Sequence, residues 1–553
     1  MNSSSPISAP SAAPSQPEGR LAYKWKVLIT VSFGVFMIIL DSTVINVAFR
    51  TLQREYGATL TDAQWVLSIY TLALGITTPM SGFLADRFGI KKIYLLGLGV
   101  FTLASALCGV APSLLLLVAA RLLQGIGGGM AQPLGPAMLY RAFPPREQGT
   151  ALGIFGITLV VAPGLGPILG GLLVDANLWR LIFFINVPIG IAAVLLGSRF
   201  LRAEGQRRKT SLDPLGLLFT TIGFGALLLG ATNAESAGWT APSTLMAFGI
   251  GIVGLILFAF VELRVSKDPL LNLRLFKNKV YLNASLVGYV TVLALFGAEF
   301  LMPLYLQVLR GFTALETGVT LLALALASGI TTPLAGRVYD KIGPRAIVVT
   351  GFALLAVNTW QLTQLQADTP INTIVLLLAL RGLALGLTVQ STFTTALGSV
   401  PLPMLPRGSS LSNSTRFVVT AIAVAALATI LSSALSPQVV EMQEKMQQTA
   451  AQSTTPNVRF GICNTPGVAA EENLPPGMAD QLKAAPAAQA AAIKQTTLAG
   501  LKTACDDYVR GFERTYLVTF FASLVALALA AFLPGWPGKW GGRGSTQTVG
   551  AGH

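Results

Sequence analysis

Five ionisable side chains interrupt the long apolar stretches of this sequence, and their types suggest proton or ion chemistry. They are Asp41, Arg121, Glu299, Arg381 and Arg416. A charge in hydrocarbon costs roughly 2.5–3.5 kcal/mol on insertion scales, so residues of this kind are usually functional. Burial disfavours the charged form of a carboxylate, whereas arginine keeps its proton. Asp41 and Glu299 are therefore the candidate proton carriers, and Arg121 is a third candidate for proton coupling.

These residues also have other interpretations. Asp41 could be a structural acid that is paired with a fixed arginine. The three arginines could neutralise the acids or bind an anionic substrate, which would change the substrate class. The candidates for lining a substrate cavity are Arg381, Arg416, Asn46, Gln132, Gln307 and Gln390. Helix packing would also account for most of the polar ones.

The apolar stretches that carry these residues are long enough to be membrane-spanning helices. The chain of 553 residues is 53% hydrophobic and only 11% charged, with a mean hydropathy of +0.65. A helix needs about 20 apolar residues to cross a hydrocarbon core of about 30 Å. The sequence predicts fourteen spans, at 27–49, 64–83, 93–111, 114–136, 149–172, 181–198, 213–232, 241–262, 283–306, 317–336, 346–365, 371–396, 411–435 and 515–534. The predicted fold class is therefore an all-α polytopic membrane protein.

The basic residues predict the orientation of these spans. The net charge is +14, and basic clusters such as Arg207, Arg208 and Lys209 fall in alternate loops. This asymmetry follows the positive-inside rule, which places both termini in the cytoplasm. The excess of positive charge is therefore explained without a nucleic-acid partner.

A repeated pentapeptide predicts how the spans are grouped. GITTP occurs at 75–79, in the second span, and again at 329–333, in the tenth. A plain repeat of six spans would place the second copy in the eighth, so two spans have been inserted between the halves. The predicted segments are a disordered cytoplasmic amino terminus without a cleavable signal peptide (1–24), a six-helix half (25–201), an inserted helix pair (202–265), a second six-helix half (266–435 and 515–534), an external loop (436–514) and a cytoplasmic tail (535–553).

Five motifs carry a resemblance to a known family. They are LDSTVINVAF (40–49), GFLADRFGIKK (82–92), RLLQGIGGGMAQP (121–133), APGLGPILGG (162–171) and WRLIFFINVPIG (179–190). Together they resemble the major facilitator superfamily, in particular its fourteen-span drug:proton antiporter-2 group. The resemblance implies two six-helix halves around a central pathway, with the two inserted helices between them.

The loop motif at 82–92 predicts a conformational latch. Its candidate residues are Gly82, Asp86, Arg87, Gly89 and Lys91, with Asp340 in the second copy of the repeat. The carboxylates could pair with a base or cap the amino terminus of a neighbouring helix, and these contacts would break when the cytoplasmic side opens. The alternative is that the charges only set the topology.

The motif at 162–171 resembles the antiporter motif of the same family. Its residues are Pro163, Gly166, Pro167, Gly170 and Gly171. Small residues at intervals of four let two helices approach closely, and prolines let a helix bend. The motif could therefore form a moving contact, although static packing would explain the same spacing.

Two of the three cysteines, Cys463 and Cys505, lie in the predicted external loop. Because thiols do not persist in an oxidising compartment, a disulfide between them is expected. Cys108 lies in a span and is expected to be an inert buried thiol.

The predicted function is a proton-coupled antiporter that exports amphipathic or cationic small molecules by alternating access, as in multidrug efflux. Its partners would be the substrate, protons and the lipid bilayer, in a monomer with or without an accessory export partner. No cofactor beyond the proton gradient, no metal site and no catalytic residues are expected, because the sequence contains no Walker motif, metal-ligand cluster or nucleophile triad. The expected location is the cytoplasmic membrane of a bacterium. An exporter of a lipid or metabolite is the alternative, and a sensor or membrane enzyme on this fold is a more distant one.

Overall fold

The computed structural model describes residues 21–203, 213–266, 268–299, 301–436, 439, 461–463 and 486–536. The predictions for the first twenty residues, for the 204–212 linker, for most of the 436–514 loop and for the tail from 537 fall outside the described residues.

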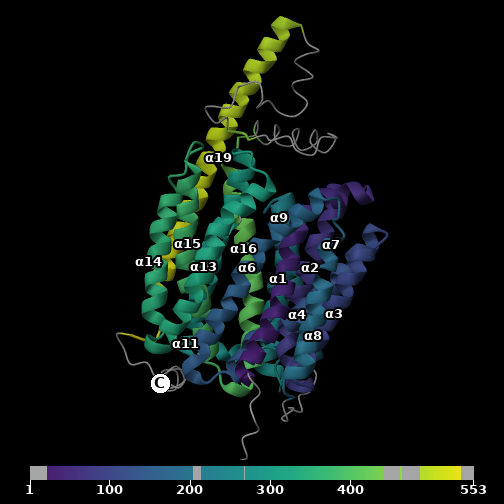
Figure 1. The fold of residues 1–553 in the computed structure, drawn as a ribbon, viewed down its shortest axis with the longest axis vertical. Helices are drawn as coiled ribbons and strands as arrows, with labels where there is room; N and C mark the ends of the chain where they lie inside the picture. Colours follow the sequence, from purple (N-terminus) through teal and green to yellow (C-terminus); the bar gives the residue numbers. More distant parts are fainter. Residues whose placement is uncertain are drawn as a thin grey trace, which may run out of the picture.

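The described chain is a bundle of helices (Figure 1). The helices are α1 Tyr23–Tyr56, α2 Leu60–Phe88, α3 Ile90–Val110, α4 Leu114–Ala131, α5 Leu134–Ala142, α6 Gln148–Asp175, α7 Leu181–Phe184, α8 Asn186–Phe200, α9 Pro214–Ala237, α10 Pro242–Phe260, α11 Lys279–Glu299, α12 Leu301–Leu304, α13 Ala314–Ile342, α14 Pro344–Leu362, α15 Ile371–Gly398, α16 Leu405–Ser433 and α19 Ala487–Ala530. Short 3₁₀ segments cover Pro145–Glu147, Leu273–Lys277 and Leu402–Met404, and π-helical segments cover Val261–Val265 and Tyr305–Leu309.

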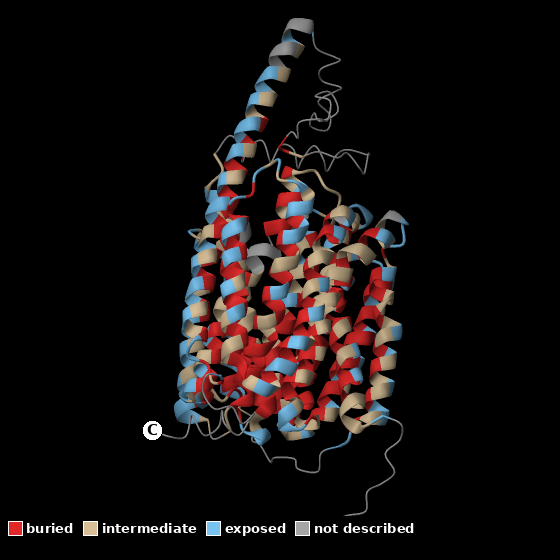
Figure 2. Cartoon of the chain, turned by 60° about the vertical axis from the view of Figure 1, so that its left-hand side comes forward, coloured by how far each residue is buried: buried red, intermediate tan, exposed pale blue. Residues whose placement is uncertain are grey.

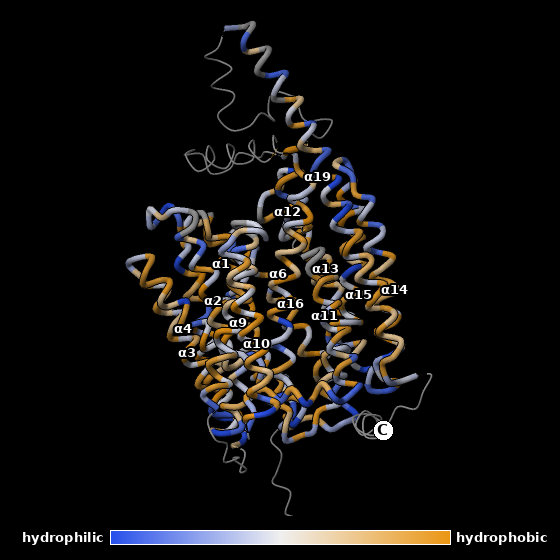
Figure 3. Tube along the Cα trace, turned by 180° about the vertical axis from the view of Figure 1, so that it is seen from behind, coloured by the Kyte–Doolittle hydropathy of each residue, from blue (hydrophilic) through white to orange (hydrophobic). Residues whose placement is uncertain are grey.

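The helices confirm the predicted fold class. Thirteen helical segments of the described chain are long and apolar enough to cross a membrane, and a shorter apolar helix covers Lys279–Leu295. Apolar residues run along the middle of the bundle and polar residues gather at its two ends (Figure 3). Some helices begin with a polar side-chain cap, as α2, α4, α9 and α13 do. Thr313 and Glu316, for example, form a reciprocal capping box at the start of α13.

The sequence repeat produces the same turn in both halves. Gly89 ends α2 with φ 96°, and Gly343 ends α13 with φ 82°. A positive φ is costly for residues with a Cβ atom, so glycine is favoured at both positions. The repeat is therefore visible in backbone conformation as well as in sequence.

The two ends of the bundle differ, and we name them by their contents. The loop-motif end carries Asp86 and Asp340, and the disulfide end carries Cys463 and Cys505. The first described helix and the last residues after α19 both reach the loop-motif end: Lys24 pairs with Glu147 at 2.5 Å, and the Trp536 N–H donates to the Ile342 carbonyl at 2.9 Å. The chain therefore crosses the bundle an even number of times.

The two halves meet mainly through two helix pairs, α2 with α16 and α6 with α13, and also where α5 contacts α16 and α6 contacts α15. Buried residues are concentrated toward the loop-motif end (Figure 2). Among the described hydrogen bonds, those that join residues 25–201 to residues 266–435 also lie toward this end. Examples are the bonds from Ser410 to the Thr78 carbonyl and from Tyr140 to the Thr394 carbonyl. The structure therefore represents a conformation that is closed at the loop-motif end.

The last span differs from its predicted limits. Its helix, α19, runs without a break for 44 residues from Ala487 to Ala530 and projects beyond the rest of the bundle at the disulfide end (Figure 1). The helix-forming composition of residues 487–514 extends the helix outward, into the segment that was predicted to be external loop.

Candidate functional site

A buried ion pair forms the centre of the amino-terminal half. Asp41 from α1 and Arg121 from α4 are 1% and 0% exposed, and Asp41 Oδ2 lies 2.5 Å from Arg121 Nη1. Taking two charges out of water is costly, and it is tolerated when the charges pair and gain further hydrogen bonds. The two proton-coupling candidates from span one and span four thus contact each other.

Two amides complete the coordination of Asp41. Gln124 Nε2 and Asn186 Nδ2 donate to Asp41 Oδ1 at 2.8 and 2.7 Å. Gln124 Oε1 also accepts from Arg121 Nη1 at 2.8 Å, and Asn186 Nδ2 lies 3.1 Å from the Ser105 hydroxyl. Asp41 is therefore bound by three donors from two helices: Arg121 and Gln124 of α4, and Asn186 of α8.

The remaining contacts of Arg121 leave the network incomplete. Its Nε donates to the Val66 carbonyl at 3.2 Å, and its guanidinium lies 4.1 Å from the centre of the Tyr70 ring. Within the described residues, Arg121 Nη2 and Asn186 Oδ1 are buried without a hydrogen-bond partner. One donor and one acceptor of this buried network are therefore left unsatisfied, which is costly in a low-dielectric interior.

The sequence did not single out Gln124 or Asn186, although both lie in stretches that carried the family resemblance. Gln124 is in RLLQGIGGGMAQP, one helical turn after Arg121, and Asn186 is in WRLIFFINVPIG. Residues three apart on a helix share a face, which was the available signal for Gln124.

The equivalent region of the second half contains Arg381 of α15. Arg381 is fully buried, and its guanidinium bonds to Asn358 Oδ1 at 3.4 Å, to the Thr359 hydroxyl at 3.0 Å and to the Ala294 carbonyl. Glu299 is the last residue of α11, and its side chain lies outside the described part of the structure. Its role as a proton carrier stays a prediction.

Arg416 lines a small cavity between α11, α15 and α16. Its guanidinium carbon lies 5.9 Å from the centre of the Phe393 ring. Gln390 lines a second, smaller space between α6, α13 and α15. The sequence predicted that Arg416 and Gln390 line one substrate cavity. In the structure each residue lines a separate cavity.

The remaining cavity candidates lie elsewhere. Asn46 on α1 and Gln307 in the π-helical segment after α12 are exposed. Gln132, at the end of α4, is partly exposed, and its Oε1 has no hydrogen-bond partner among the described residues. None of the three lines either described cavity.

At the loop-motif end, Asp86 pairs with a residue that sequence reasoning missed. Asp86 Oδ2 lies 2.6 Å from Arg407 Nε, and Arg407 Nη1 donates to the Pro269 carbonyl at 2.8 Å. Arg407 belongs to α16, which begins six residues before the apolar run from 411. Gly82 permits this approach, because a Cβ atom there would lie 2.8 Å from the Pro406 carbonyl.

Asp340, the counterpart of Asp86, caps a helix of the opposite half. It accepts from the backbone N–H groups of Gly149 and Thr150 at 2.7 and 2.8 Å, and from the Thr150 hydroxyl at 2.7 Å. These residues begin α6, so the carboxylate also faces the positive end of the helix dipole. The sequence predicted two contacts for the latch carboxylates, and each repeat has one of them. Asp86 pairs with a base, and Asp340 caps the amino terminus of a helix.

The other latch candidates stabilise their own half. Lys91 Nζ donates to the carbonyls of Ser198 and Leu201, which end α8, at 2.8 and 2.6 Å. Arg87 lies over the Phe88 ring at 5.5 Å. These described contacts do not join the two halves.

The antiporter-like motif lies in α6, between α1 and α13. A Cβ atom at Gly170 would meet the Val44 carbonyl at 2.9 Å, and one at Gly166 would overlap Thr43. On another side of α6, Pro167 lies close to Gly318 of α13, while a Cβ atom at Gly171 would meet nothing within 4 Å. Pro163 and Pro167 are both inside this helix. The motif therefore connects α1, which carries Asp41, with the other half.

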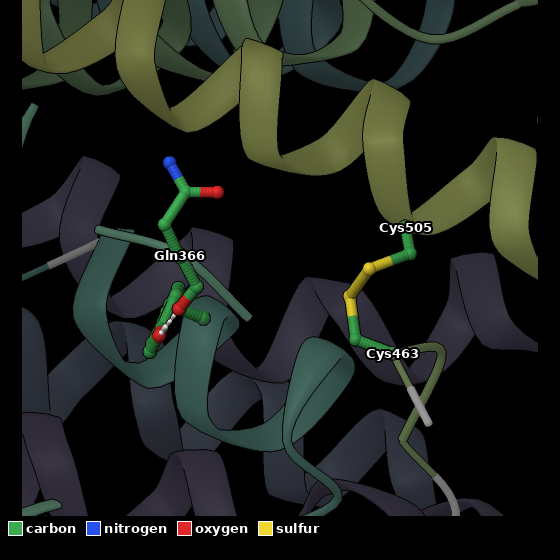
Figure 4. Close-up of a disulfide and its surroundings, with 4 residues drawn as sticks. Gln366, Cys463 and Cys505 are labelled. Atoms are coloured by element: carbon green, nitrogen blue, oxygen red, sulfur yellow. Dashed lines mark hydrogen bonds between the residues drawn. A yellow bond between two sulfur atoms is a disulfide. The ribbon is translucent and has the colours of Figure 1, made fainter. Parts of the chain in front are cut away.

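At the disulfide end, Cys463 and Cys505 are joined (Figure 4). The Ile462 and Cys463 N–H groups donate to the carbonyls of Val308 and Leu309 at 2.9 and 3.1 Å. The disulfide therefore ties α19 to a segment that is bound to the end of span nine.

Comparisons with known proteins agree with this architecture. Residues 31–424 match the family model of the Major Facilitator Superfamily. The chain is 35% identical over 403 residues to the uncharacterized MFS-type transporter YhcA of Bacillus subtilis, which covers 73% of this chain and 76% of that protein. It is 33% identical over 390 residues to the multidrug export protein EmrB of Escherichia coli, which covers 70% and 76%.

A solved structure shows the same fold at low identity. The crystal structure of the human organic anion transporter MFSD10 matches with a TM-score of 0.54 and 16% identity, covering 90% of this chain and 99% of that one. The match supports the fold alone, and the family assignment comes from the sequence matches. The chain is therefore a membrane transporter of the Major Facilitator Superfamily, related to the multidrug-efflux proteins of its fourteen-span drug:proton antiporter-2 group.

Proposed function

We propose that this chain is a proton-coupled antiporter that exports amphipathic small molecules by alternating access. The observation that carries the proposal is the buried Asp41–Arg121 pair, in which the acid can accept a proton and the base cannot lose one. A change of charge at Asp41 alters a network that joins α1, α4 and α8. The proposed location is the cytoplasmic membrane of a bacterium, with the loop-motif end in the cytoplasm.

Protonation of Asp41 would release Arg121 from the only carboxylate that it contacts among the described residues. Arg121 would then depend on the Gln124 amide, the Val66 carbonyl and the Tyr70 ring. Because α1 would lose a charged link to α4, its position relative to that helix would become easier to change.

A contiguous route leads from this pair to the contact between the halves. Thr43 and Val44 follow Asp41 on α1 and pack against Gly166 and Gly170 of α6. The amino terminus of the same helix is held by Asp340 of the other half. A shift of α1 would therefore push α6. Movement of α6 would in turn weaken the hydrogen bonds between Asp340 and the start of that helix.

The chemistry of the substrate follows in part from the described charges. Asp41 is neutralised by Arg121, so it offers no free negative charge to a cationic substrate. We therefore retain the amphipathic part of the predicted substrate class and see no support for a requirement of positive charge.

Reconstitution in liposomes tests the proposal. Purified protein should move 1-naphthoate or the neutral dye N-phenyl-1-naphthylamine against its gradient when a proton gradient is imposed, and substrate addition should drive proton flux recorded by a pH dye. Asp41→Asn should bind the probe but lose uphill movement, because Asn fixes the neutral form. Asp62→Asn, which removes an exposed acid of α2, is the matched control.

Two results would contradict the proposal. One is probe movement that is indifferent to the proton gradient. The other is uphill accumulation by Asp41→Asn with the pH dependence of the wild type, which would make Asp41 a structural acid and leave Glu299 as the next proton carrier to test.

A further inference from the structure

We propose that the cavity lined by Arg416 binds the anionic group of the substrate, so that the preferred cargo is an amphipathic organic anion. The inference rests on the proposed function only for the direction and driving force of transport. The binding preference itself follows from the charges and hydrogen-bond donors of the cavity.

Arg416 lies deep in the bundle. It is eleven residues after Leu405, the start of α16 at the loop-motif end, which is roughly 16 Å along a helix at 1.5 Å per residue. An arginine near a membrane surface can extend its head group into water, but one near the middle of a span cannot easily do so. The positive charge of Arg416 therefore lies at a depth where it costs free energy unless a ligand or water contacts it.

Arg416 has no counter-ion in the described structure. Among the described residues it makes no hydrogen bond or ion pair; its described side-chain interactions are the cation–π contact with Phe393 and an electrostatic interaction with Tyr289. By contrast, the buried arginines Arg121 and Arg407 each contact a carboxylate, and Arg381 is held by Asn358, Thr359 and the Ala294 carbonyl. Arg416 therefore keeps donors available for an incoming acceptor.

The three helices that line the cavity offer almost no negative charge. Neither α15 nor α16 contains an aspartate or glutamate, and α11 contains only Glu299. Glu299 is eight residues beyond Thr291, the last α11 residue at the cavity, so its backbone is roughly 12 Å further along the helix. The cavity therefore has a positive electrostatic character.

Ser285 provides a second indication. Its side chain lines the same cavity and is only 6% exposed, and its hydroxyl has the Tyr289 hydroxyl beside it but no well-formed hydrogen bond within the described chain. A buried hydroxyl is normally paired, and one that is not costs about 1–3 kcal/mol. A carboxylate accepts hydrogen bonds without donating any, so it could satisfy both Ser285 and Arg416.

The rest of the wall suits an apolar body. Val389, Phe393, Ala284 and Ala396 provide apolar surface, and Gly288 leaves room beside them. A cation in this cavity would lose its hydration and face a like charge, so the site discriminates against it.

A matched set of naphthalene compounds tests the charge preference by equilibrium binding to the purified full-length protein. We expect 1-naphthoate to bind more tightly than neutral 1-naphthamide, and 1-naphthylmethylammonium to bind most weakly. Arg416→Gln should weaken naphthoate binding about 10- to 100-fold and leave naphthamide binding nearly unchanged. Arg416→Lys should keep the preference for the anion with a smaller loss, because the charge stays while the planar donor group is lost.

Arg337→Gln is the control for removing a positive charge, because Arg337 is exposed on α13 and away from the cavity. It should retain the wild-type order of affinities. If Arg416→Gln does not fold, Arg416→Lys and Ser285→Ala still test the site, since Ser285→Ala should weaken naphthoate more than naphthamide.

The inference is overturned if the wild type shows no saturable binding of naphthoate, if it prefers the ammonium compound, or if Arg416→Gln leaves the ratio of affinities unchanged. These results are independent of the proton-coupling test. Naphthoate binding without proton-driven movement would contradict the proposed function alone, whereas proton-driven movement with no charge preference would contradict this inference alone.

Discussion

Asp86 of α2 and Arg407 of α16 form an ion pair across 321 positions of sequence, with Oδ2 and Nε 2.6 Å apart. Both side chains are almost fully buried, 6% and 4% exposed. In the other repeat, Asp340 achieves the corresponding contact with backbone N–H groups of α6. At the loop-motif end, one ion pair and one capped helix thus supply the charged contacts between the halves, beside hydrogen bonds such as that from Ser410 to the Thr78 carbonyl.

Removing the ion pair should open this end. Asp86→Asn leaves Arg407 buried without its charged partner, and breaking a buried pair costs about 3–5 kcal/mol of the state that contains it. We expect the population open at the loop-motif end to rise about tenfold or more. Spin labels at the exposed positions Lys92 and Lys341 would record it as longer inter-label distances. Asp62→Asn, at the other end of α2, should leave the distances unchanged, and an unchanged distribution in Asp86→Asn would exclude the latch.

The Asp41–Arg121 pair should show strong coupling in a double-mutant cycle. Asp41→Asn and Arg121→Gln should each lower the melting temperature, because each leaves a buried polar or charged group without its partner. The double variant should regain part of the lost stability but no uphill transport. Thermal unfolding in detergent measures the first effect and proteoliposome flux the second. Purely additive losses of stability would show that the pair does not act as a unit.

The packing of α6 can be tested with two neighbouring glycines. Gly170→Ala places a methyl group 2.9 Å from the Val44 carbonyl, whereas Gly171→Ala meets nothing within 4 Å. Gly170→Ala should therefore destabilise the protein by about 1–3 kcal/mol, as overpacking usually does. Gly171→Ala should be neutral or slightly stabilising. Melting temperatures of the two variants would decide, and equal values would contradict the described contact between α6 and α1.

The disulfide should stabilise the protein in its oxidised form. Cys463 and Cys505 are 42 positions apart, and closing a loop of this length is worth roughly 4 kcal/mol in the chain-entropy model. Mass spectrometry of a non-reducing digest should detect the linked peptides, and a reducing agent should lower the melting temperature. In the variant with both cysteines replaced by serine, the reducing agent should have no effect. Two free thiols in freshly isolated protein would contradict the expected external location.

The orientation in the membrane can be tested with an impermeant thiol reagent in intact cells. Lys502 in α19 and Arg202 after α8 are both exposed. A cysteine introduced at Lys502 should react from outside, and one at Arg202 should react only after the cells are opened. Labelling of Arg202→Cys from outside would reverse the proposed topology.

The sequence predicted the features of this molecule that depend on local composition. Apolar runs predicted the spans because hydrocarbon imposes a minimum length on each helix. The GITTP repeat led to the equivalence of Asp86 and Asp340, and glycine at 89 and 343 matched the positive φ at both turns. Asp41 and Arg121 were found because a charge inside an apolar run is rare.

The features that sequence reasoning missed depend on tertiary contacts. Arg407 lies in a polar stretch, LPRGSS, that resembles an ordinary loop until α16 brings it against Asp86. Asn186 is one amide among several polar residues near a helix start, and only the packing of α8 against α1 shows that it binds Asp41. The limits of the last span were misplaced because hydropathy detects the part of a helix in lipid and not its polar extension.

The uninterrupted α19 also has a mechanical consequence. The part before Cys505 is roughly 27 Å long at 1.5 Å per residue, and the disulfide ties the helix at the base of this part. A rigid rod held near its middle acts as a lever, so a small tilt of the last span within the bilayer becomes a displacement of several ångströms at the far tip. If the last span tilts during transport, a fluorophore near that tip would magnify the movement, without a label near the transport pathway.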